Sequence, residues 1–179
     1  MAQVVFRVAY ANKDLFAQML LQIPGGAQLG NALGMEIQDL SDTVKNCGFS
    51  VFTSAIENGG SVRCIVAKNA AATLTRKEID KLTEHAKGIG AKGLAYVRWV
   101  DEAPQCSFAK FMKDDEMAAI LSAAAAEKGD VILIVADTKN SIVLSTLGAL
   151  RLIAADKLEI KREGFALLWI TEFPFFDWD

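Results

Sequence analysis

The sequence predicts an α+β protein with two layers, in which a mixed, largely antiparallel sheet carries helices on one face. Two observations predict this fold. From residue 49 onward, strand-like and helix-like segments follow in the order β-β-α-β-β-α-β-α-β, and residues 49–126 alone give a β-β-α-β-β-α core. The chain has 179 residues, of which 52% are hydrophobic and 23% charged, a composition that excludes disorder and fills a core without disulfides.

Beyond residue 34, the first predicted elements are a short helix and a hairpin. Ser41 is a suitable cap for a helix that runs through Lys45. The segment 49–56 reads as a strand, and residues 57–60 contain the Asn-Gly pair that favours a tight turn, because Asn and Gly accept a positive φ at little cost. The return strand is predicted at 61–67.

A longer helix is predicted to begin after Thr75. Thr75 and Glu78 have the spacing of a capping box, in which each side chain accepts a hydrogen bond from a backbone amide of the first turn. Apolar residues then recur at helical spacing, at Ile79, Leu82, Ala86 and Ile89. The sole histidine, His85, lies off this apolar stripe, so we expect it to be solvated or half-buried.

The remaining elements alternate between strands and helices. Acids in the first turn and Gly129 past the end mark a helix from Asp114, as the helix dipole and C-cap preferences require. The other predicted elements are a strand at 94–100, a partner strand at 107–111, a central strand at 131–137, a long helix at 141–159 and a last strand within 165–173.

No motif in the sequence predicts catalysis or metal binding. The GxGxxG pattern at 88–93 follows a helix and precedes a strand, the reverse of the order in a dinucleotide-binding turn. A single histidine supports neither a histidine-pair metal site nor a Ser-His-Asp arrangement. The acids at 114–116 are explained by the helix N-terminus that they precede. We therefore expect no catalytic and no metal-ligating residue.

Net charge bears on nucleic-acid binding, and cysteine content bears on the cellular compartment. The net charge of −3 gives no sign of nucleic-acid binding by itself. Three widely spaced cysteines without a CxxC pair fit a reducing cytosol. The N-terminus lacks a signal-peptide pattern, and no apolar run approaches the about 18 residues that span a bilayer. We expect a cytoplasmic protein without membrane contact.

Several segments, which follow one another in the same order as in the family, resemble one known module. The sequence is similar to the GAD domain, the insertion domain of bacterial-type aspartyl-tRNA synthetases, and a related module occurs in subunits of tRNA-dependent amidotransferases. The matching segments are GMEIQDLSD (34–42), VFTSAIENGGSVRCI (51–65), LTRKEIDKLTEHAKGIGAKGLAYVR (74–98), AKF (109–111), GDVILIVAD (129–137) and LGALRL (147–152). The resemblance implies a GAD/DCoH-like fold with a β-β-α-β-β-α core, the same order that residues 49–126 predict.

The resemblance also implies a domain organisation. Residues 1–34 do not match the family, and Pro24 with four glycines sets them apart from the rest of the chain. Residues 35–155 correspond to the GAD domain. Residues 156–179, with the aromatic-rich end FALLWITEFPFFDWD, look like the strand with which such synthetases re-enter their class II catalytic domain. We expect the chain to be a fragment of a larger enzyme.

The implied parent activity is that of an aspartate–tRNA ligase. Such enzymes attach aspartate to tRNA with ATP and Mg and are typically homodimers. Their catalytic residues lie in motif 2, with an Arg in an FRxE-like context, and in the glycine-rich motif 3, neither of which occurs in this sequence. We therefore expect this chain to be inactive alone, without a cofactor of its own, with tRNA and its own catalytic domain as partners.

Candidate tRNA contacts are suggested by charge and turn chemistry. Lysine and arginine side chains would contact phosphates, and a glycine turn can approach a backbone closely. The candidates are Asn58, Gly59, Gly60, Arg63, Lys68, Arg98 and Lys110.

Two other classes of function stay open at this point. One is a free-standing GAD-type module that binds tRNA or a protein without an enzyme around it. The other is a structural interaction domain whose C-terminal aromatic residues seek a partner, as contiguous exposed apolar surface often does.

Overall fold

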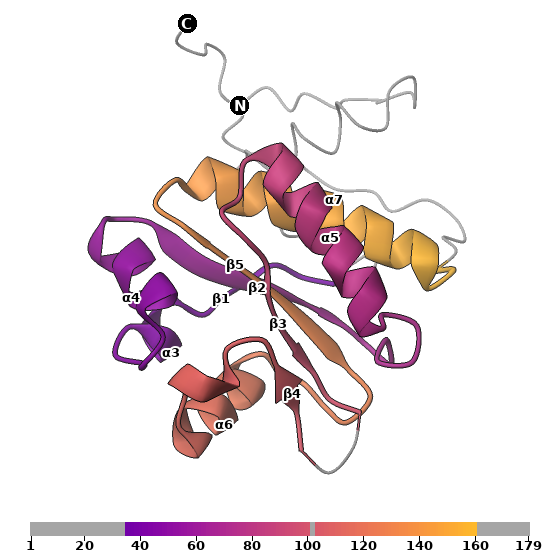
Figure 1. Ribbon diagram of the computed structural model, residues 1–179, viewed down its shortest axis with the longest axis horizontal. Coiled ribbons are helices and arrows are strands. Elements are labelled where there is room, and N and C mark those ends of the chain that lie inside the picture. Colours follow the sequence, from indigo (N-terminus) through magenta and orange to yellow (C-terminus); the bar gives the residue numbers. More distant parts are fainter. Residues whose placement is uncertain (1–34, 101–102, 161–179) are drawn as a thin grey trace, which may run out of the picture.

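A computed structural model describes residues 35–100 and 103–160 and shows one sheet between two groups of helices (Figure 1). The strands are β1 (Gln38–Asp39), β2 (Ser61–Ala67), β3 (Ala95–Arg98), β4 (Gln105–Cys106) and β5 (Val131–Asp137). The helices are α3 (Ser41–Val44), α4 (Ser50–Glu57), α5 (Arg76–Ile89), the 3₁₀ helix η1 (Ala109–Phe111), α6 (Asp114–Ala123) and α7 (Asn140–Lys157). The strand order is β1-β2-β5-β3-β4, and every neighbouring pair is antiparallel.

The two central strands are apolar on both faces. Alternate residues of β2 and β5 enter two separate cores, because successive side chains of a strand point to opposite faces. Ile65 and Leu133 face the core covered by α5 and α7, whereas Cys64 and Ile134 face the core beneath α4 and α6. Figure 1 shows α5 and α7 on one side of the sheet and α3, α4 and α6 on the other. The α+β class is confirmed, but the expectation of helices on one face is wrong.

The segment predicted as the first strand is the helix α4. Phe52 and Ala55 are buried three residues apart, a spacing that places two side chains on one face of a helix and on opposite faces of a strand. The predicted hairpin turn is instead the end of this helix, where Gly59 has a φ of 79° and the Gly60 amide donates to the Ala55 carbonyl at 2.9 Å. The predicted order β-β-α-β-β-α for residues 49–126 is therefore wrong at its first element: this range begins with α4 and continues through β2, α5, β3, β4 and α6. The strand that pairs with β2 is the short β1, which precedes α3 and α4.

Other predicted elements are confirmed or displaced by a few residues. The strands β2, β3 and β5 and the helices α5, α6 and α7 lie where the sequence predicted them, and β5 is central. The partner of β3 is β4, whereas residues 109–111 of the predicted partner strand form η1. Residues 1–34 and the strand predicted within 165–173 lie outside the described residues, and the domain boundaries at 34 and 155 stay predictions.

Several helices end in a residue with positive φ, and not all of these residues are glycines. Gly90 follows α5 with a φ of 116°, whereas Ala125 closes the C-terminal turn after α6 at 48° and Glu159 follows α7 at 52°. The Ala126 amide donates to the Leu121 carbonyl at 3.0 Å, the bond typical of this type of helix end. A left-handed backbone is costly for a residue with a Cβ, so Ala125 carries strain that a glycine would not.

We predict that Ala125→Gly stabilises the protein by about 0.5–1 kcal/mol, because glycine adopts positive φ without steric cost. Urea unfolding would measure the change. The matched control is Ala119→Gly, the same change at an exposed position inside α6, which should destabilise by about 0.5–1 kcal/mol. Equal destabilisation by both substitutions would show that Ala125 is not strained.

A carboxylate joins the two helices of one face. Thr75 is the N-cap residue of α5, but no side-chain cap hydrogen bond forms there. Glu78 instead accepts hydrogen bonds from Lys81, at 2.6 Å within α5, and from Lys157 near the end of α7. These bonds, that from Lys157 foremost, lower the pKa of the Glu78 carboxyl from its ordinary 4.5 to about 2. The predicted capping box is therefore replaced by a contact between helices.

We predict that Glu78→Gln removes stability in a pH-dependent way. A carboxyl whose pKa is lower in the folded state contributes fully above about pH 4.5 and loses that contribution as the pH falls towards 2. The difference in unfolding free energy between the native protein and Glu78→Gln should therefore shrink over this range. Urea titrations at several pH values would measure it, and a difference independent of pH would contradict the assignment.

Candidate functional site

Lys68 lies where β2 ends, and its ammonium group is engaged by the protein itself. Its Nζ donates to the Asp130 carboxylate at 2.9 Å and to the Ala125 carbonyl at 2.7 Å. Asp130 is buried and precedes β5, so its charge needs this partner. The Lys68 side chain is about half exposed, but its ammonium group is already paired with the Asp130 carboxylate.

Arg98 lies at the same end of the sheet. Residues Ala67 and Arg98 both pair with Val131, from opposite sides of β5. The Arg98 guanidinium donates through Nε and Nη2 to the Ala71 carbonyl, at 3.0 and 2.6 Å. The structure thus brings Lys68 and Arg98 to the same end of the sheet, where each bonds to a loop of the protein itself.

Arg63 and the glycine turn also make contacts within the chain. The Arg63 guanidinium lies 3.1 Å from the Asp39 carboxylate, across the β1–β2 pair. The Asn58 amide side chain donates to the Ser54 carbonyl at 2.7 Å. A Cβ on Gly60 would lie 2.0 Å from the Asp137 carbonyl oxygen. Gly60 does approach a backbone closely, as the sequence suggested for this turn, but that backbone is the protein's own.

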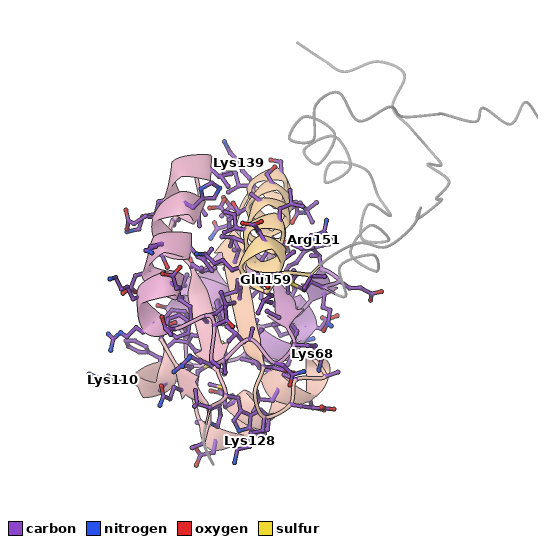
Figure 2. The ribbon with its side chains drawn as sticks, turned by 90° about the vertical axis from the view of Figure 1, so that its right-hand side faces the viewer. Lys68, Lys110, Lys128, Lys139, Arg151 and Glu159 are labelled. Atoms are coloured by element: carbon purple, nitrogen blue, oxygen red, sulfur yellow. The ribbon has the colours of Figure 1, made fainter. Side chains whose placement is uncertain are left out.

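Lys110 is the remaining candidate, and it differs from the others. It is exposed on η1 and forms no ion pair or hydrogen bond within the described residues. Figure 2 shows Lys110 projecting at the edge of the molecule, away from Lys68. The structure therefore does not unite the predicted cations into one patch. The adjacent Phe111, 57% exposed, was missed because the sequence placed it in a strand.

The remaining candidate groups of the described residues are the cysteine thiols, the histidine and the side chains of types that ligate metal ions. Burial raises the pKa of all three thiols, that of Cys64 to about 12, so each stays protonated at neutral pH. His85 is exposed on α5, within the range we expected. Residues 35–100 and 103–160 contain no cluster of three side chains able to hold a metal ion. No helix in these ranges combines the length and apolar character needed to cross a bilayer.

Comparison with known proteins relates this chain to the GAD domain and to aspartate–tRNA ligases. The family model described as GAD domain matches residues 52–147. An aspartate–tRNA ligase of Ruminiclostridium cellulolyticum is 52% identical over 148 residues, which are 82% of this chain and 25% of the relative. Those of Agathobacter rectalis and Clostridium botulinum (strain Kyoto) are 50% and 51% identical, over 81% and 79% of this chain and 24% of each relative. The chain thus spans about a quarter of the length of these relatives.

Proposed function

The chain belongs to the GAD domain family, and we propose that it serves as the non-catalytic GAD module of an aspartate–tRNA ligase. The observation that carries this proposal is the identity of 50–52% to aspartate–tRNA ligases over 142 to 148 residues.

The activity proposed for the whole enzyme is the attachment of aspartate to tRNA at the expense of ATP, with Mg bound at a catalytic domain. That enzyme would be cytoplasmic and homodimeric. This chain would have tRNA and the catalytic domain as its partners and would hold no cofactor.

Two auxiliary roles are compatible with this proposal. The module either positions tRNA or braces the catalytic domain. The engagement of Lys68 and Arg98 within the fold leaves them little part in phosphate binding. Positioning of tRNA would then rest on exposed cations such as Lys110, each of which adds about one unit to the dependence of log affinity on log salt.

The experiment is a domain replacement in the Ruminiclostridium cellulolyticum enzyme. We expect a chimera carrying residues 35–160 of this chain to charge tRNA within about tenfold of the native rate, since the segments are closely related. We also expect the isolated 179-residue chain to catalyse no aspartate-dependent pyrophosphate exchange.

A deletion of the same region separates the two roles. Loss of tRNA charging with pyrophosphate exchange intact supports tRNA positioning, because exchange needs no tRNA. Loss of both activities in a folded enzyme supports bracing. A folded but inactive chimera, or exchange by the isolated chain, would overturn the proposal.

A further inference from the structure

Four phenylalanine rings form a cluster that reaches from the core to the surface. Phe52 and Phe108 are each 1% exposed, whereas Phe111 is 57% exposed. Phe49 links them: its ring stacks on Phe108, with centroids 5.3 Å apart and 17° between planes, and on Phe111, at 5.6 Å and 29°. Phe52 supports Phe49 edge-on at 4.8 Å. The outermost member of this stack is therefore a phenyl ring open to solvent.

The position of Phe111 is fixed by its backbone. The Phe111 amide donates to the Phe108 carbonyl at 3.0 Å within the 3₁₀ turn. A Cβ on Gly48 would lie 2.3 Å from the Phe111 carbonyl oxygen, so the chain before α4 packs directly against this residue. A ring held in this way loses little further conformational entropy when a ligand stacks on it.

Two lysines lie on either side of Phe111 in the sequence. Lys110 and Lys113 are exposed, and neither ammonium group pairs with a carboxylate of the described residues. Of the nearby acids, Glu116 accepts from the Lys113 amide at 2.9 Å and is turned towards the backbone. Asp114 and Asp115 lie in the first turn of α6, where the helix dipole favours them. These acids disfavour phosphate next to α6, so we take Lys110 as the lysine that would contact phosphate.

We propose that Phe111 is a stacking platform for an unpaired base of RNA, whose neighbouring phosphate contacts Lys110. The proposal rests on the tRNA-positioning role given above and names the site that performs it. A flat exposed ring with a free cation beside it is the combination that binds single-stranded nucleic acid, since every base has a face that stacks and every nucleotide a phosphate. Phe111 would continue, with a base, the stack that Phe108 and Phe49 begin.

The test is binding of labelled tRNA transcript to the full 179-residue chain over a range of salt concentrations. Phe111→Leu keeps an apolar side chain and removes the ring, so affinity should fall about 5- to 150-fold with an unchanged salt slope. Lys110→Ala should instead reduce the salt slope by about one. The matched controls are Leu152→Ala and Lys77→Ala, exposed residues of α7 and α5 on the other face of the sheet, which should leave affinity and slope unchanged.

The outcomes separate this site from the proposed function. If the native chain binds tRNA and Phe111→Leu, folded by its circular dichroism, binds equally well, the stacking platform is wrong while the tRNA-positioning role stands. If the native chain shows no binding at low salt, both fall. If Phe111→Leu leaves tRNA binding intact but prevents association with a catalytic domain supplied separately, the exposed ring is a protein contact, and the proposal is overturned in favour of bracing.

Discussion

The ends of three strands depend on the buried carboxylate of Asp130. It accepts hydrogen bonds from the Lys68 ammonium and from the amides of Asn69 and Glu127, at 2.8 to 2.9 Å. Its backbone carbonyl accepts from the Trp99 amide at 3.0 Å, just past β3. A buried carboxylate without partners would cost several kcal/mol. The segments next to β2, β3 and β5 must therefore all be folded before the carboxylate has its full set of hydrogen bonds. Asp130 therefore links the residues after β2, the turn before β5 and the residue after β3.

The same requirement divides the basic residues into two groups. Lys68, Arg98 and Arg63 each serve a partner within the chain, either a carboxylate or a carbonyl. Lys110 has no such partner among the described residues and stands beside an exposed ring. The sequence alone could not separate these groups, since it placed all four cations on or beside predicted strands. What distinguishes them is whether the fold supplies a nearby oxygen atom, which is a property of tertiary structure.

The fold was predictable where the pattern is long or the environment uniform. The apolar run of β5 and the apolar stripe of α5 each indicate one kind of element, whereas α4 has only eight residues, too few for periodicity to separate a helix from a strand with certainty. The Thr75 capping box failed because Glu78 found Lys157, 79 positions away in sequence. Local rules cannot anticipate such a partner. The candidate site was incompletely predicted for a similar reason. Residues 107–111 were predicted as a strand, so the exposure of Phe111 on the 3₁₀ helix η1 was not foreseen.

The central claim is that the hydrogen bonds between Asp130 and its partners Lys68, Asn69 and Glu127 are as stable against opening as the sheet itself. Native-state hydrogen exchange measures this directly, residue by residue. The amides of Asn69 and Glu127, which donate to the carboxylate, should exchange with an opening free energy close to that of Leu133 inside β5. Exchange of these two amides at the rate of exposed loops, with Leu133 protected, would show that the Asp130 contacts open independently of the sheet and do not stabilise it.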